Sequence, residues 1–293
     1  QWGFLPKEFC KAADRLTFKI TLPIMLFLDM SAVDILHDFQ PKFVLFCFAA
    51  TLAGILVVWG AAHVLIRDKS IVGEFAQASY RSSAAVLGVA FIQNIYGTAG
   101  MAPLMILGSV PLYNVMAVVI LMLEGPEAAQ AGSMTAKLKK SVKGILTNPT
   151  LLGIAAGFAW SLLGLPMPTM AGKTLSSIAS LTSPLALLAI GAGFKGRKAL
   201  GYLRPTAVAT AVKLMALPAL FLPAAVHLGF TDEKLVALLV MLGSIATPSC
   251  YVMAKQMGHE GVLTGSVCVT TTLFSAFSLT FWLFLLRSMG CIA

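Results

Sequence analysis

The sequence predicts an all-α polytopic membrane protein, and its composition and patterning support this fold class. Hydrophobic residues make up 58% of the 293 residues, charged residues make up only 11%, and the mean hydropathy is +0.87. A water-soluble domain of this size could not carry so much apolar surface. The apolar runs are long enough to cross a hydrocarbon core of about 30 Å, and their Leu, Ala and Gly content favours helices over the alternating pattern of a barrel.

Nine apolar segments are expected to span the bilayer, four before and five after a polar central loop. They cover approximately residues 16–35, 43–66, 88–108, 110–123, 144–165, 175–194, 205–228, 235–257 and 261–286. The polar stretch 67–81 is expected to form a loop. The chain therefore divides into a first repeat at 1–124, a central loop at 125–143 and a second repeat at 144–293.

The two halves resemble each other in sequence. Thr21-Leu-Pro-Ile-Met-Leu-Phe-Leu matches Thr182-Ser-Pro-Leu-Ala-Leu-Leu-Ala, so Gln1 corresponds to a position where the second half has already completed one helix. We therefore expect a further helix, absent here, before Gln1, although a natural nine-span chain is the alternative. Five spans per repeat would insert the halves with opposite orientations, as in many secondary carriers.

Basic residues follow the positive-inside rule, which explains the net charge of +9 without nucleic acid as a partner. Alternate loops at 7–15, 67–69, 137–143 and 195–204 carry most of the Lys and Arg residues. We expect a multi-pass protein of the plasma membrane, or of the inner membrane in a bacterium. The central loop is then cytoplasmic and the C-terminus lies outside.

Motifs for metals, nucleotides and hydrolytic enzymes are missing from the sequence. The five cysteines and four histidines show no metal-ligand spacing, and no phosphate-binding loop, His-Glu-x-x-His or Gly-x-Ser-x-Gly motif occurs. We expect no enzyme activity, no metal site and no cofactor other than a coupling proton or sodium ion.

The stretch 88–108 is apolar but unsuited to one continuous helix. It is interrupted by Gly97, Gly100 and Pro103. Each Gly costs about 1 kcal/mol in a helix interior and each Pro about 3 kcal/mol. Non-helical backbone at membrane depth must be covered by protein or by a water-filled cavity, so such a break indicates a binding site. A proline-kinked structural helix is the alternative. The polar residues around the break are Gln93, Asn94, Tyr96 and Thr98.

A second interrupted stretch lies at 242–251 and contains Ser244, Thr247, Pro248 and Ser249. When Gly108 is placed on Gly258, Ser244 lies opposite Asn94 and Pro248 opposite Thr98. Two inverted broken helices are expected to cross near the middle of the bilayer. Their free N-terminal N–H groups favour an anionic ligand, for which the polar residues of both stretches are the candidates.

Two charged residues are expected deep inside spans. Asp29 is a candidate for a coupling proton, with an ion pair to a neighbouring helix as the alternative. Lys213 is a candidate to balance an anionic substrate or to pair with the crossing, although its long side chain could instead extend to the membrane interface.

Several short motifs resemble the auxin efflux carrier family, which includes bacterial malonate and malate carriers and the plant PIN auxin transporters. The resemblance covers essentially the whole chain and includes both broken stretches. The motifs are Thr147-Asn-Pro149-Thr-Leu-Leu-Gly153, Ser183-Pro184-Leu-Ala-Leu-Leu-Ala-Ile-Gly191-Ala and Leu22-Pro23-Ile-Met-Leu-Phe27.

This resemblance implies a ten-helix fold of two inverted five-helix repeats, as in bile-acid symporters and sodium/proton antiporters. A scaffold (1–36 and 144–194) would hold a transport domain (41–124 and 205–289) that moves in an elevator-like manner. Homodimers would form through the scaffold. The family's crossover asparagine would map onto Asn94 and its second crossover proline onto Pro248. Pro103 departs from the pattern because it lies some residues beyond Asn94.

The function expected is secondary active transport of a small organic anion across the lipid bilayer. The substrate would be a monocarboxylate or a dicarboxylate such as malonate or malate, or an auxin-like acid. A sodium/proton antiporter is one alternative, but neither broken stretch contains the Asp or Glu residues that such chemistry requires. A membrane sensor that does not transport is another alternative.

Overall fold

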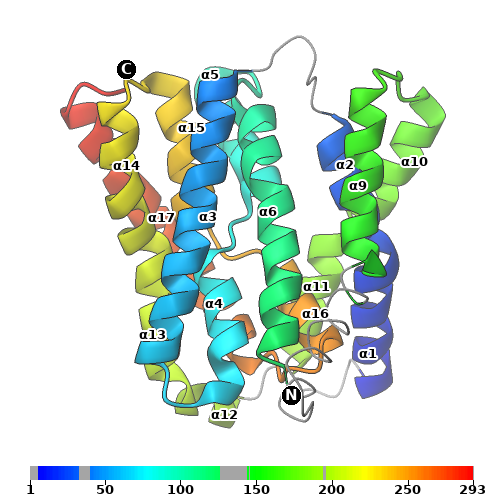
Figure 1. Cartoon of the computed structure of the whole chain (residues 1–293). Helices are drawn as coiled ribbons and strands as arrows, with labels where there is room; N and C mark the ends of the chain where they lie inside the picture. The colour runs from blue at the N-terminus through cyan, green and yellow to red at the C-terminus, as the bar shows by residue number, and fades with distance from the viewer. Residues whose placement is uncertain (1–5, 33–39, 126–143, 145, 194–195, 293) are drawn as a thin grey trace.

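The computed structural model describes residues 6–32, 40–125, 144, 146–193 and 196–292, and every regular element in these ranges is helical (Figure 1). The predicted all-α class is thus confirmed. The predicted central loop, apart from Gly125, lies outside the described residues. Within the described residues, five helical stretches are long and apolar enough to span a membrane. They are Pro41–Leu65 (α3), Ala102–Leu123 (α6), Thr169–Gly193 (α10 and α11), Leu203–His227 (α13, η4 and α14) and Val262–Ser288 (α17).

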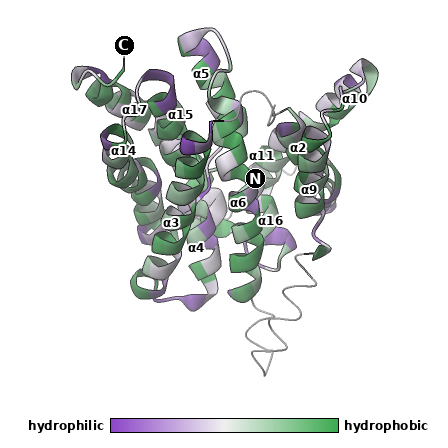
Figure 2. Cartoon of the chain, turned by 45° about the horizontal axis from the view of Figure 1, so that its top comes forward, coloured by the Kyte–Doolittle hydropathy of each residue, from purple (hydrophilic) through white to green (hydrophobic). Residues whose placement is uncertain are grey.

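The outer surface of these helices is apolar, as expected for contact with lipid. Figure 2 shows hydrophobic residues along the lengths of the helices. Large apolar side chains such as Phe277 and Phe284 are each 73% exposed. Such exposure would be costly in water but is natural in a hydrocarbon environment.

One set of helices, called here the α2/α9 group, packs side by side at one edge of the molecule (Figure 1). Its members are α1 (Lys7–Leu16), η1 (Thr17–Thr21), α2 (Leu22–Ser31), α9 (Pro149–Leu162), α10 (Thr169–Ala179) and α11 (Thr182–Gly193). Glycines allow α9 to lie against the α2 backbone. A Cβ atom added to Gly153 would lie 2.4 Å from the Pro23 carbonyl oxygen. A Cβ atom added to Gly157 would lie 2.4 Å from the Phe27 carbonyl oxygen.

The remaining helices are called here the α15 group, after α15, which packs against α3, α5, α6, α14, α17, η3 and η4. Besides α3, α6 and α17, they are η2 (Lys69–Ile71), α4 (Val72–Tyr80), η3 (Ala84–Gly88), α5 (Val89–Tyr96), α12 (Gly196–Gly201), α13 (Leu203–Ala211), η4 (Val212–Ala216), α14 (Leu217–His227), α15 (Asp232–Gly243) and α16 (Ser249–Gln256). Within α15 every residue from Leu235 to Gly243 is buried. This short helix therefore forms the centre of the core.

The expectation of a loop at 67–81 was wrong, because α4 lies there and all nine of its residues are buried. Its polar side chains find partners on other elements. The Glu74 carboxylate accepts hydrogen bonds from the backbone N–H groups of Gly261 (2.8 Å) and Thr264 (3.1 Å). A buried polar helix of this kind looks like a loop in a hydropathy pattern, since tertiary partners cannot be seen there.

Candidate binding site at two interrupted helices

The first interrupted helix breaks after Tyr80. Helix α4 ends there, Arg81 has an extended backbone (φ −76°, ψ 125°), and the helix resumes with η3 at Ala84. Two serines, Ser82 and Ser83, occupy the break. Serine favours such positions because its hydroxyl competes with helical backbone hydrogen bonds.

The second interrupted helix breaks between Gly243, the last residue of α15, and Ser249, the first residue of α16. The two breaks meet in space, since the Ser83 N–H donates to the Ile245 carbonyl at 3.0 Å. The Ala246 N–H donates to Thr271 Oγ1 of α17 at 3.1 Å. Non-helical backbone is therefore satisfied by neighbouring protein, as membrane depth requires.

Lys213 joins the two breaks. Its side chain is fully buried, and its ammonium donates to the carbonyl oxygens of Tyr80 (3.0 Å) and Leu242 (2.9 Å) and to Ser82 Oγ. Both carbonyls belong to the C-terminal turn of a half-helix, where the helix dipole is negative. Lys213 therefore lies where the two breaks meet and does not extend to the membrane interface. Its charge balances the partial negative charge at the C-terminal ends of α4 and α15.

Arg81 is the second buried cation of the site, with only 3% of its surface exposed. Its guanidinium donates to Asn114 Oδ1 and to the Met253 thioether, which is a weak acceptor. No carboxylate of the described residues forms an ion pair with it. The Glu74 carboxylate, on the same helix α4, accepts bonds from Gly261 and Thr264 instead. The site therefore carries excess positive charge in a buried setting.

Three buried polar atoms next to the breaks have no hydrogen-bond partner in the described structure. They are Gln77 Oε1 and the Tyr80 hydroxyl on α4, and Ser244 Oγ in the second break. An unsatisfied buried polar group costs about 1 to 3 kcal/mol, so groups of this kind are typical of places that receive a ligand or water.

The predicted residues of the second break lie in or directly beside the break that the structure shows. Ser244 is buried, and the Thr247 and Ser249 hydroxyls lie 3.1 Å apart on either side of Pro248. The break was predicted at the correct place, because Pro248 lacks the N–H that a continuous helix needs.

The predicted residues of the first break lie elsewhere, and the predicted position of the crossing in this half needs correction. Asn94 is exposed on α5, and its amide donates only to the Ala90 carbonyl of the same helix. It lies roughly 16 Å along the helix from Ser83, at 1.5 Å per residue. The same half of the helix carries Gln93 and Tyr96, and Thr98 follows directly after it.

The interruption at Gly97 and Gly100 is real, but it reverses the chain between α5 and α6. Both glycines have positive φ (76° and 43°), and Pro103 lies in the first turn of α6. The Met101 N–H donates to Glu233 Oε1 at 3.0 Å, which fixes the turn to the start of α15. Glycine and proline therefore mark a helix-to-helix turn here and not the crossing.

Asp29 lies on α2, in the other group of helices. Its Oδ2 atom is buried without a hydrogen-bond partner. Asp29 therefore lies on a different group of helices from the two breaks. Among the described residues, it forms no ion pair of the kind that the alternative interpretation required.

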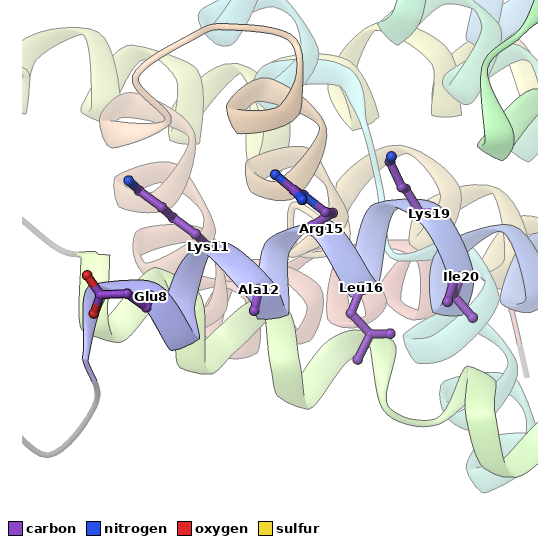
Figure 3. A pocket seen from close by; sticks show the side chains of 7 residues that line it. All are labelled: Glu8, Lys11, Ala12, Arg15, Leu16, Lys19 and Ile20. Carbon is purple, nitrogen blue, oxygen red and sulfur yellow. The ribbon is translucent and has the colours of Figure 1, made fainter.

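A further set of positive charges lies on α1 and η1. Lys11, Arg15 and Lys19 project from one side of the helix, whereas Leu16 and Ile20 project from another (Figure 3). These residues line an open cavity of about 500 Å³. All five are exposed, which fits a helix end near a membrane surface and not a buried substrate site.

Arg81, Gln77 and Tyr80 were missed by sequence reasoning, because all three lie in the stretch 67–81 that was expected to form a loop. The available signal was the Arg-Ser-Ser run followed by apolar residues, which resembles a helix start. No group of three potential metal ligands occurs within the described part of the chain.

Comparison with known proteins gives one clear result. The sequence model of a family described as "Membrane transport protein" matches residues 1–283. No curated protein sequence matches the chain.

Proposed function

The chain belongs to the auxin efflux carrier family of membrane transport proteins, and on this basis we propose that it is a secondary active carrier of a small organic anion. The proposed site is the meeting point of the two breaks, centred on Arg81. The substrate class is a monocarboxylate or dicarboxylate, such as malonate, malate or an auxin-like acid.

The observation that carries this proposal is the buried Arg81 guanidinium, which has no carboxylate partner among the described residues. Arginine binds carboxylates through two parallel hydrogen bonds, and such bonds are about twice as strong as neutral ones. A substrate carboxylate would replace the weak contact of Arg81 with the Met253 thioether. It would also neutralise a charge that is costly to bury alone.

Neutral groups around Arg81 suit the rest of such a substrate. The unpartnered Tyr80 hydroxyl and Ser244 Oγ are donors for a second carboxylate or a substrate hydroxyl. The unpartnered Gln77 Oε1 is an acceptor for a hydroxyl or a protonated acid. This mixture favours a small polar anion over a metal cation, which would need several carboxylates.

For the transport mechanism we propose the inverted five-plus-five repeat, with the α2/α9 group as scaffold and dimer interface and the α15 group as the moving domain. Helix α16 packs against α1, η1 and α11 of the scaffold, so an elevator-like movement has to slide along these contacts. Asp29, with its unpartnered Oδ2, is the proposed carrier of a coupling proton. The α12 end of the molecule is the proposed cytoplasmic side.

The test is uptake of labelled carboxylates into proteoliposomes, with and without proton or sodium gradients. We compare Arg81→Gln with Arg81→Lys, and use Arg287→Gln as a control for an exposed charge. Losing a buried charged contact costs about 2 to 5 kcal/mol, so Arg81→Gln should reduce kcat/KM about 30-fold or more. The lysine variant should retain part of the activity.

The same experiment separates the two possible locations of the site. Asn94→Ala should leave KM unchanged, because the Asn94 amide bonds only to its own helix and is exposed. Full uptake by a correctly folded Arg81→Gln protein, or loss of binding in Asn94→Ala alone, would move the site away from Arg81. Thermal unfolding of each purified variant shows whether a loss reflects misfolding.

A further inference from the structure

The side chain of Asn114 on α6 binds the Arg81 guanidinium and is itself buried. Its Oδ1 atom accepts a hydrogen bond from Arg81 Nη2 at 2.5 Å, and only 1% of its surface is exposed. The two residues come from different elements, since Arg81 lies in the first break and Asn114 in the middle of α6. Asn114 therefore orients the guanidinium from outside the break.

The orientation of the Asn114 amide follows from its two neighbours. Its Nδ2 atom donates to the Val110 carbonyl oxygen at 2.9 Å. A carbonyl oxygen can only accept a hydrogen bond and a guanidinium can only donate, so the NH2 group faces Val110 and the amide oxygen faces Arg81. The side chain thus presents an acceptor to Arg81 and has no second way to satisfy both neighbours.

The part of α6 that carries Asn114 is fixed to the elements of both breaks. The adjacent Tyr113 stacks on Tyr80 of α4, with 5.9 Å between the ring centroids. The Tyr113 hydroxyl donates to the Met241 carbonyl oxygen of α15 at 2.9 Å. Because α4 and α15 each end at a break, the acceptor for Arg81 keeps a defined position relative to the site.

The chemical identity of this partner leaves the charge of Arg81 without compensation. Buried arginines are usually paired with a carboxylate, and aspartate has nearly the same shape as asparagine. The amide instead accepts a hydrogen bond without supplying negative charge. Of the five N–H donors of the guanidinium, two have acceptors among the described residues, namely Asn114 Oδ1 and the Met253 thioether. Enough donors remain for two parallel bonds to a carboxylate.

We propose that Asn114 is the positioning residue of Arg81 and that its neutral amide determines the charge selectivity of the site. This inference rests on the proposed function, since it concerns the same carboxylate site. The amide fixes the guanidinium but leaves its positive charge unpaired, so the negative charge has to be supplied by the substrate. A carboxylate on residue 114 would occupy the same donors and would exclude a substrate anion.

The experiment combines thermal unfolding in detergent, with and without malonate or malate, with uptake of the labelled acids into proteoliposomes. A bound acid should raise the Tm of the wild type. Asn114→Asp should be at least as stable as the wild type without the acid, because the buried guanidinium gains a counter-charge, but the acid should no longer raise its Tm. Its KM should rise about 30-fold or more with kcat little changed, the loss expected when a buried charged contact is removed.

Two variants serve as comparisons. Asn94→Asp makes the same chemical change at an exposed position of α5, where the amide bonds only to its own helix, and should leave the KM and the Tm shift unchanged. Asn114→Leu has nearly the same size but neither acceptor nor charge. It should raise the KM by about 2- to 10-fold, the effect of one hydrogen bond, and it tests the positioning role even if Asn114→Asp does not fold.

The possible outcomes distinguish this inference from the proposed function. An unchanged Tm shift and KM in a folded Asn114→Asp or Asn114→Leu protein, while Arg81→Gln loses both, would overturn the inference and leave the site at Arg81 intact. So would a loss of stability in Asn114→Asp without a change in KM, because that describes a purely structural role. If neither acid shifts the Tm of the wild type, or if both shift Arg81→Gln as strongly, the proposed site fails and this inference fails with it.

Discussion

At the residue scale, the most consequential side chain is Lys213, which holds two half-helices together. Replacing it by Met keeps most of its volume but leaves the carbonyls of Tyr80 and Leu242 without their donor. We expect Lys213→Met to lower the free energy of unfolding by about 2 kcal/mol, since hydrogen bonds from charged groups contribute 1.5 to 3 kcal/mol each and removal of the buried charge offsets part of the loss.

Thermal unfolding in detergent measures this effect. Lys213→Gln, which retains donors, is the matched comparison and should lose less stability. A Lys213→Met protein that is as stable as the wild type would mean that the ammonium does not balance the helix ends.

Sequence reasoning recognised Lys213 as important but did not recognise Arg81. A cation near a predicted loop is most often an interfacial anchor, and nothing in the local pattern shows that α4 is buried on all sides. Conversely, Asn94 was favoured because it lies in the stretch interrupted by Gly97 and matches the crossover asparagine that the family resemblance implies. Local composition reveals interruptions that contain Gly or Pro, but the break at Arg81–Ser83 depends on contacts between residues far apart in the chain, such as Ser83 and Ile245.

At the element scale, close packing of α9 on α2 depends on glycine. A methyl group at Gly157 would lie 2.4 Å from the Phe27 carbonyl oxygen, so the helices must separate. We expect Gly157→Ala to destabilise the protein by about 1 to 3 kcal/mol, measured by thermal unfolding.

Gly60 provides the control for that prediction. It lies inside α3 with no atom within 4 Å of a new Cβ. Gly60→Ala should therefore leave stability unchanged or raise it by up to about 1 kcal/mol, because alanine is the better helix former. If both substitutions destabilise the protein equally, the loss at Gly157 does not come from the α2–α9 contact.

The elements differ in how well the sequence predicted them. The long apolar helices, such as α3 and α17, were predicted within a few residues, because a bilayer demands about 20 apolar residues per span. The second break was found through Pro248. The first break was misplaced, since its residues contain neither Gly nor Pro and the backbone opens only because Lys213 and Ile245 supply partners.

At the scale of the whole molecule, the proposed elevator movement implies two bodies that move relative to each other. Spin labels at Ala12 of α1 and Gln256 of α16 lie on opposite bodies, and both positions are exposed. After replacement of the five native cysteines, electron–electron double resonance should show a distance between these labels that changes when substrate is added.

A pair within one body is the control for this measurement. Ala53 of α3 and Ala219 of α14 are exposed positions in the same α15 group. Their distance should stay constant under all conditions. If both pairs change together, or neither changes, the molecule does not move as two rigid bodies.

The link between the two breaks also has a consequence for biosynthesis. The Ser83 N–H and the Tyr80 carbonyl emerge from the ribosome long before their partners, Ile245 and Lys213. Until the second half has been inserted, the first break must keep these groups solvated or bound to other partners. The site is therefore among the last parts of the protein to mature, and a chain that stops before Lys213 exposes unpaired backbone at membrane depth that cellular quality control can recognise.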